Sequence, residues 1–506
     1  MFTSIQKKLL LEKPLLWNTK FVPMIILGIV FHIVHFFLGW LQGTVNFSNK
    51  NKIDIEFSAV SFGILAVILA IILWLVAYFK NNSFKSFYKK SKNSLFYEWL
   101  QLFVIIFLLS SFYVSFSIGK QLHERSYFSY EETQKRCEII ANADIFIDGF
   151  FKGTEIDSLA SGLIDSLGNK TAKLKRQEVD YYATAVDAQE LVYKDHIVFN
   201  GKKFKEYSLL NRSIHEFSII SKKMDSLNEI KVKNWLFEND ITSVKKLMTD
   251  YLDLINEHQL KTNLTLETWF EATYKSPEFD SFLYISPYFK EHETYNSYRY
   301  HNYGNSAIKP YDVKYSKYYI QQDILKDKYE TVSLAHTNNL VDFEAVIVFL
   351  YLALSFSLLL FSFRVTSGKS WLISLVSLGI MNIIIGVFGA LGSSSSFYFG
   401  SLLVILIGIS IYFSKIYVEA KRKEISGIIL NLILWLSVYF IPIIYNLVTD
   451  YYMNSQYIDE YKYVSPEYTW LREHTSTMFV LNFIFMIFAL FLLGRIIRNW
   501  KGIAEN

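Results

Sequence analysis

The sequence predicts an all-α polytopic membrane protein with eight transmembrane helices and one mainly helical domain outside the membrane. Three observations carry this prediction. Of the 506 residues, 52% are hydrophobic and only 19% are charged, whereas soluble domains average about a quarter charged. Charged residues are almost absent from several windows long enough to cross a bilayer, which takes about 20 apolar residues. Lysine and arginine gather in the segments between alternate windows.

The apolar windows mark the predicted membrane spans. The first window is long for the core of a signal peptide, and no small-x-small cleavage site follows it, so we expect it to be retained. Pro442, in the seventh window, permits a kink. The windows are residues 21–42, 57–79, 97–118, 343–363, 371–391, 398–416, 426–448 and 477–494.

The orientation follows from the excess of basic residues in cytoplasmic loops of membrane proteins. With the N-terminus inside, the inner segments carry eighteen lysines and arginines and the short outer loops carry four. An even number of spans preserves this alternation. We therefore expect both termini, the loop 80–96 and the loop 414–425 to be cytoplasmic, in a multi-pass protein of the plasma (bacterial inner) membrane.

The predicted spans divide the chain into five parts. Residues 1–20 form a basic amphipathic segment, which favours a position in the lipid headgroup layer, although a frayed tail is the alternative. Spans 1–3 occupy 21–118, and spans 4–8 occupy 341–497. Residues 119–340 contain no comparable apolar window and form the extracytoplasmic domain, while 498–506 form a cytoplasmic tail.

Helical spacing dominates the 119–340 domain. Apolar residues recur at helical intervals over 242–262, with Thr242 as the expected N-cap, and 316–336 also has a helical pattern. A short hairpin is expected over 191–207, where Asn200-Gly201 provides a turn. Cys137 is the single cysteine, so the domain is held together by packing without a disulfide.

Two histidines are the first candidate site residues. His32 and His35 are three residues apart, so they share one face of the first predicted span. An ionisable residue at that depth suggests proton relay, metal binding or a hydrogen bond to a neighbouring helix. We favour hydrogen bonding toward the bundle interior, because a lipid-facing ring nitrogen would lack a partner.

Asp54 and Glu56 are the second candidates, at the end of the first outer loop. Membrane glycosyltransferases that use lipid-linked sugars also place an acidic pair in this loop, as base and metal ligand. The loop here is short for such a site, and carboxylates are favoured at a helix N-terminus in any case. Asn382 and Asn431 lie within predicted spans, where amides usually hydrogen-bond neighbouring helices.

Several function classes find no support in the sequence. The net charge of +4 is too small to suggest nucleic-acid binding. Hydrolase and metalloprotease signatures are absent from the sequence, and we expect no catalytic residues, metal or cofactor. The expected environment is the lipid bilayer.

The layout resembles the permease subunits of ABC-type transporters. The shared features are an N-terminal amphipathic segment, a bundle of spans, basic inner loops and a large outer domain. Those permeases often have six spans, whereas eight are predicted here. The resemblance implies a transport subunit without catalytic activity, which works with a separate cytoplasmic ATPase at the loops 80–96 and 414–425.

Two other functions stay open at the level of sequence. One is a non-enzymatic membrane sensor or assembly protein that displays residues 119–340. The other is a membrane-embedded transferase that uses a lipid-linked substrate at Asp54 and Glu56. The sequence also leaves open whether the chain forms a homo-oligomer.

Overall fold

The computed structural model divides the chain into two compact units. We call Met1–Trp40, Ile55–Gly119 and Val341–Asn506 the bundle unit, and Leu41–Asp54 with Lys120–Leu340 the insert unit. The structure describes residues 2–80, 92–147, 196–199, 202–205, 217–271, 273, 282–283, 314–315, 318–391, 395–419, 424–454, 457–458, 461–462 and 465–501.

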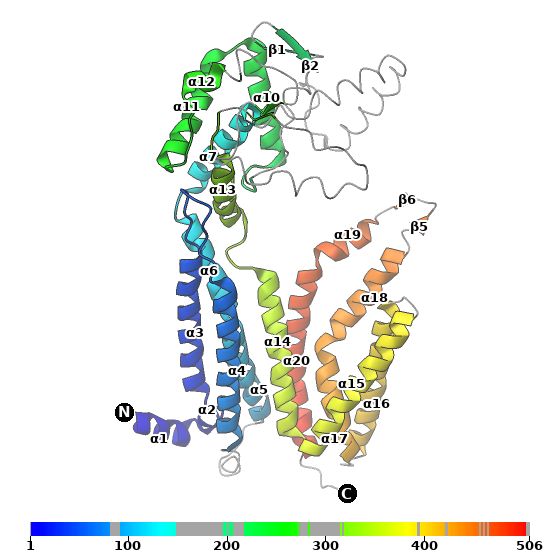
Figure 1. Ribbon diagram of the computed structural model, residues 1–506. Helices are drawn as coiled ribbons and strands as arrows, with labels where there is room; N and C mark the ends of the chain where they lie inside the picture. The colour runs from blue at the N-terminus through cyan, green and yellow to red at the C-terminus, as the bar shows by residue number, and fades with distance from the viewer. Residues whose placement is uncertain are drawn as a thin grey trace. The chain divides into compact units, whose positions relative to one another are not determined.

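Long apolar helices make up most of the bundle unit, which confirms a mainly helical polytopic layout (Figure 1). By length and composition, seven helices or joined helices of the described chain could cross a membrane, or eight if one bent pair counts as a span. The seven are α3 (Phe21–Gln42), α4 (Glu56–Lys80), α14 (Phe343–Val365), α15 (Gly368–Leu391), α16 (Ser395–Val418), α17 (Glu424–Leu436) joined to α18 (Phe440–Asn454), and α20 (Thr475–Lys501).

The bent pair replaces the single helix expected over 97–118. The helices α5 (Ser94–Ser110) and α6 (Phe112–Arg125) meet at an angle of 40°. At the bend, the hydroxyls of Ser110 and Ser111 both donate to the carbonyl of Phe107. Serine side chains that bond back to a helix carbonyl often bend the helix, which accounts for the break.

The seventh expected helix, 426–448, is also interrupted. A 3-10 turn, η4 (Ser437–Tyr439), separates α17 from α18. Pro442 has no N–H to donate to the carbonyl of Val438, four residues earlier, so regular α-helix cannot continue through this point with all its bonds. The sequence thus contained the cause of the break, although the expected range treated the segment as one helix.

The N-terminal segment forms two short helices, α1 (Phe2–Glu12) and α2 (Pro14–Asn18), with Pro14 at the first position of α2. The end of α2 is anchored to the bundle, because the Thr19 hydroxyl donates to Gln101 at 2.7 Å and the Trp74 indole donates to the Thr19 carbonyl at 2.7 Å. Figure 1 shows α1 and the end of α20 at the same end of the bundle unit.

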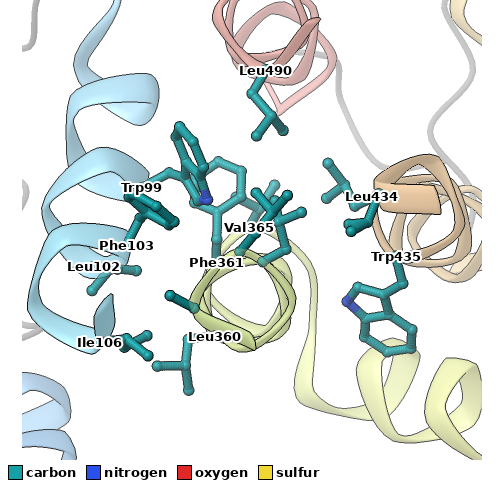
Figure 2. Close-up of a cluster of buried hydrophobic side chains, with 14 of the residues drawn as sticks. Trp99, Leu102, Phe103, Ile106, Leu360, Phe361, Val365, Leu434, Trp435 and Leu490 are labelled. Carbon is teal, nitrogen blue, oxygen red and sulfur yellow. The ribbon is translucent and has the colours of Figure 1, made fainter. Parts of the chain in front are cut away.

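A continuous hydrophobic core joins the spans. Trp99, Leu102 and Phe103 from α5 pack against Leu360, Phe361 and Val365 from α14 (Figure 2). Leu434 and Trp435 of α17 and Leu490 of α20 belong to the same buried cluster. The helix α14 is therefore the central element of this core.

The described residues of the insert unit are also mainly helical. It contains α7 (Tyr130–Ala143), α10 (Lys222–Glu238), α11 (Ile241–Glu257), α12 (Leu266–Phe270) and α13 (Gln322–Thr337), with a 3-10 turn at Asp144–Phe146. The described helices share one hydrophobic core, which contains the buried side chain of Cys137. The strands β1 (His196–Phe199) and β2 (Lys202–Lys205) pair antiparallel, as the hairpin prediction requires, although the turn at Asn200-Gly201 lies outside the described residues.

Two expectations about helices in the insert unit were wrong in detail. The N-cap of α11 is Asp240, whose side chain accepts from the Ser243 N–H at 3.1 Å, and Thr242 lies inside the helix. The helix expected over 316–336 begins only at Gln322, because Ile320 forms a bridge with Thr262. Most of the tyrosine-rich stretch before this helix lies outside the described residues.

The segment Leu41–Asp54 between α3 and α4 belongs to the insert unit, which the sequence did not indicate. Lys50 pairs with Asp323 at 2.7 Å, and Lys52 pairs with Asp327 at 2.9 Å. Phe47 stacks on His258, with ring centroids 4.6 Å apart. The segment 41–54 is thus fastened along its length to the domain that follows 120.

Two glycines set the closest helix approach in the bundle unit. A Cβ on Gly39 of α3 would lie 1.9 Å from the Phe116 carbonyl oxygen of α6, and one on Gly119 would lie 2.1 Å from the Phe36 oxygen. By contrast, a Cβ on Gly379 or Gly386 of α15 would meet nothing within 4 Å.

We therefore expect Gly39→Ala and Gly119→Ala each to destabilise the full-length protein by about 1–3 kcal/mol, because the backbones must separate. Gly379→Ala and Gly386→Ala are the matched controls and should leave stability unchanged or slightly higher. The measurement is the fraction of monodisperse protein that survives stepwise heating in detergent. Equal melting profiles for the two pairs would contradict the close packing of α3 and α6.

Candidate functional site

The bundle unit contains a buried ion pair at the junction of three helices. Glu98, near the start of α5, is only 6% exposed. Its Oε1 accepts from the Tyr78 hydroxyl of α4 at 2.7 Å and from Nε of Arg364, near the end of α14, at 3.2 Å. A buried carboxylate without such partners would cost several kcal/mol. Because Glu98 depends on Tyr78 and Arg364, its two contacts hold the ends of α4, α5 and α14 together.

A second polar cluster lies one helix farther along, between α14, α15 and α17. Asn431 is fully buried, and its oxygen accepts from the Thr366 hydroxyl at 3.1 Å. Its amide donates to Ser374 at 3.2 Å. The indole of Trp435 donates to Ser362 at 3.0 Å. The cluster thus joins three helices through hydrogen bonds, which is the structural role the sequence predicted for Asn431.

A third polar cluster surrounds the 3-10 turn η4. Asn482 of α20 is fully buried and donates to the Val438 carbonyl at 2.8 Å and to the Tyr351 hydroxyl of α14 at 2.6 Å. Tyr351 in turn donates to the Phe479 carbonyl at 3.0 Å. Beside it, the hydroxyls of Ser355 and Tyr439 lie 3.1 Å apart. Asn482 therefore provides the donor that Pro442 cannot supply to Val438.

The two candidate histidines make contacts inside the bundle unit. His32 Nδ1 lies 2.6 Å from the Ser115 hydroxyl, and its Nε2 lies 2.9 Å from the Leu108 carbonyl. Because a carbonyl only accepts, Nε2 carries the proton and Nδ1 accepts from the serine. These contacts join α3 to the bent pair α5–α6, in line with the structural role that we favoured.

His35 is buried more deeply, at 2% exposure. Its Nδ1 donates to the Phe31 carbonyl at 2.8 Å, and its ring packs on Phe112 with centroids 4.3 Å apart. Its Nε2 has no hydrogen-bond partner in the described part of the chain. Among the described residues, no group of three or more potential ligands surrounds either histidine or any other point.

The remaining candidates have separate environments. Asn382 of α15 accepts from the Tyr398 hydroxyl of α16 at 2.7 Å and donates to the Leu378 carbonyl, so it joins two neighbouring spans. Glu56 is the first residue of α4, and its carboxylate accepts from Tyr113 at 3.1 Å. Asp54 is an exposed residue of the insert unit.

The sequence analysis did not identify the residues that form the buried polar contacts of the bundle unit. Glu98 is the one charged residue in the window 97–118, and this isolation was a usable signal. Arg364 was counted only as a basic residue that sets orientation. Asn482 is the one asparagine of its span, but its partners Tyr351 and Val438 come from distant segments that no local pattern connects.

The insert unit has a polar cluster of its own. Nη1 of Arg136 donates to both carboxylate oxygens of Glu257 at 2.8 and 2.9 Å and to the Tyr329 hydroxyl at 3.0 Å. The Tyr329 hydroxyl lies 2.8 Å from His258 Nε2. Since the tyrosine oxygen already accepts from Arg136, we assign its proton to the bond with His258, which makes this imidazole neutral with its own proton on Nδ1.

Comparison with known proteins returns no match. No protein-family model, curated protein or solved structure matches the chain.

We expect Arg364→Met to destabilise the bundle unit by about 3–5 kcal/mol, because it leaves the buried Glu98 carboxylate without its cation. The chain that combines Arg364→Met with Glu98→Gln should recover much of this loss, since no buried charge remains. Apparent melting temperatures of the full-length protein in one detergent measure both effects. A double variant as unstable as the single one would show that the ion pair is not the origin of the effect.

We expect the insert unit to lose stability as pH decreases below about 6.5, the ordinary pKa of histidine. Burial lowers the pKa of His258, so the unfolded state binds more protons in that range and is favoured as the pH falls. Labelling of the buried Cys137 by a maleimide reports opening of the same core. The rate for His258→Gln divided by the wild-type rate cancels the titration of the thiol.

This ratio should exceed one at pH 7.5 and approach one at pH 5.5, where the wild type has lost the contribution of the neutral ring. Lys222→Gln, an exposed substitution in α10, is the control and should give a ratio near one throughout. A His258→Gln ratio that does not change with pH would contradict the assignment of the neutral ring.

Proposed function

We propose that the chain is the membrane-spanning permease subunit of an ABC-type transporter and that it works with a separate cytoplasmic ATPase. The ion-paired junction of Tyr78, Glu98 and Arg364 carries this proposal. It binds the ends of α4, α5 and α14 at the borders of two basic segments, 80–96 and 364–369. Force applied to those segments by a partner would reach three spans at once, as a subunit driven by an external motor requires.

The finer topology belongs to the same proposal. Eight spans result when α5 and α6 form one bent third span and α17, η4 and α18 form the seventh. The excess of basic residues favours both termini in the cytoplasm of a bacterial inner membrane, with the insert unit outside. The start of α3 and the end of α20 lie at one end of the bundle unit, which supports an even number of spans (Figure 1).

The exposed side chains of the N-terminal helix α1 support a position at the membrane surface. The Leu11 side chain of α1 is 81% exposed, and Lys7 and Lys8 of the same helix are exposed as well. Exposed leucines beside lysines are typical of a helix that lies in the headgroup layer of an anionic membrane. The segment after α2 is anchored to Trp74 of α4 and Gln101 of α5. We therefore propose that α1 and α2 lie at the cytoplasmic end of the bundle unit.

The test is an ATPase assay on the protein purified with its partners from its native membrane. A photo-crosslinking residue at Lys92 or Lys369, on the proposed cytoplasmic side, should capture a nucleotide-binding protein. The same residue at Asn49, in the outer loop, should not. We expect the complex to hydrolyse ATP, and we expect the Arg364→Met, Glu98→Gln double variant to keep the captured partner but lose coupling of hydrolysis to the transport cycle, seen as a changed ATPase rate.

A chain that purifies intact, captures no nucleotide-binding protein from either inner position and shows no associated ATP hydrolysis would refute the permease proposal. Capture from Asn49 and not from the inner positions would show that the orientation is reversed.

A further inference from the structure

The helix α1 lies across the direction of the spans at one end of the bundle unit. Figure 1 shows it extending sideways from the ends of α3 and α4. Every side chain from Lys7 to Lys13 is exposed except that of Leu9, which is partly buried. A single helix of 11 residues is marginal in water, so a surface that covers α1 would stabilise it.

The exposed part of α1 combines apolar and basic side chains. Residues three and four apart are neighbours on a helix surface, so the exposed Leu11 lies beside both Lys8 and Lys7. A leucine between two lysines fits the boundary between acyl chains and phosphates. The leucine enters the apolar layer, while the long lysine side chains keep their ammonium groups among the headgroups.

The backbone of Lys20 has an unusual conformation between α2 and α3. Lys20 follows Thr19, the C-cap of α2, and its φ of 55° is in the left-handed region. Glycine is the usual residue at this position after a helix, because a residue with a Cβ is strained there. A lysine in this place indicates that its side chain has a use that offsets the strain.

The ammonium group of Lys20 has a fixed position but no anionic partner among the described residues. Its Nζ lies 3.8 Å from the centre of the Trp17 ring. Partial burial lowers the pKa of the Lys20 amine, which is the direction expected for an ammonium group without a counter-ion. Ile26, the first exposed isoleucine of α3, follows about 9 Å along the helix. Lys20 therefore stands at the edge of the apolar surface of the span, the level at which tryptophan and lysine meet lipid headgroups.

The charge of the segment 1–20 indicates an anionic partner. Its charged side chains are Lys7, Lys8, Lys13, Lys20 and the single acidic residue Glu12. No ion pair of any of the four lysines is found in the part of the chain that the structure describes. An acidic protein could also satisfy these lysines, but the exposed leucines and the place of Lys20 next to a span favour a lipid surface.

We propose that the segment 1–20 binds the phosphate groups of anionic phospholipids in the adjacent leaflet, with Lys20, Lys7 and Lys8 as the ligands. In the proposed orientation this is the cytoplasmic leaflet. The bound lipids hold α1 against the membrane, while the contacts of Thr19 with Trp74 and Gln101 hold the other end of the segment on α4 and α5. The inference goes beyond the permease function and does not depend on an ATPase partner.

Fluorescence of the full-length protein in nanodiscs tests the contact between α1 and lipid. A nitrobenzoxadiazole label, whose emission moves to shorter wavelength in an apolar environment, is attached to Leu11→Cys. The matched control is Leu227→Cys, an exposed leucine of α10 in the insert unit. The buried Cys137 of the otherwise unchanged chain gives the background.

We expect a larger shift at position 11 in phosphatidylglycerol than in phosphatidylcholine nanodiscs, and no lipid-dependent shift at position 227. Soluble glycerol phosphate added to the phosphatidylcholine nanodiscs should not reproduce the shift, because it has no acyl chains.

Melting of the full-length protein in mixed micelles tests the role of Lys20. The phosphatidylglycerol concentration that gives half of the rise in melting temperature measures the apparent affinity. Lys20→Gln should raise this concentration about fivefold, since a lysine at an anionic surface contributes about 1 kcal/mol. Lys20→Arg should keep the wild-type value. Lys415→Gln, which removes an exposed lysine at the end of α16, is the control and should change it little.

Lys20→Gly separates the backbone from the side chain. It should raise the melting temperature in micelles without phosphatidylglycerol, because the left-handed conformation is no longer strained. It should nevertheless weaken the response to this lipid as much as Lys20→Gln does.

Equal phosphatidylglycerol responses of the wild type and Lys20→Gln would overturn the role of Lys20. A label at position 11 that stays in water in both nanodiscs would overturn lipid as the partner, and a protein would then be the surface that covers α1. Equal shifts in both lipids would overturn the requirement for an anionic headgroup. All of these outcomes are independent of the ATPase assay.

Discussion

The structure depends on one constraint, that polar groups among apolar helices must find their partners inside the protein. The carboxylate of Glu98 is acceptable in its place because Tyr78 and Arg364 reach it from two other helices. The carbonyl that Pro442 leaves without a helical donor is satisfied by Asn482. Each of these contacts connects segments that are distant in sequence. The hydrogen bonds that satisfy the buried polar groups therefore also determine which helices pack together.

The coarse fold was predictable because its signals are local. A helix needs about 20 apolar residues to cross a bilayer, so a span is visible as an apolar window in the sequence. Every candidate span of the structure coincides with such a window. The roles of His32 and Asn431 as contacts between helices could also be predicted, since an inward-facing polar side chain in a span has few other options. The bends were less accessible: those at Ser110-Ser111 and near Pro442 depend on one or two side chains that a hydropathy window averages away.

The partners of buried polar residues could not be predicted, because they depend on tertiary pairing. Nothing around Glu98 identifies Arg364, which lies 266 positions away. The same holds for the segment 41–54. Its Lys50 and Lys52 pair with carboxylates of α13, and its Phe47 stacks on His258, which follows α11. Charge and aromaticity in a short loop are compatible with a solvated turn, and only the fold shows that the loop completes the insert unit.

Because the segment 41–54 packs on the rest of the insert unit, cutting the chain before 120 and after 340 would not separate the two units intact. The piece 120–340 alone would lack Phe47 and would expose the faces of Phe128, His258 and Tyr329 that it covers. In the remaining piece, Phe47 would lie in the short loop between α3 and α4 without the aromatic partners that it has in the insert unit. The insert unit is therefore discontinuous in sequence, and its core is complete only when the segments 41–54 and 120–340 are present in one chain.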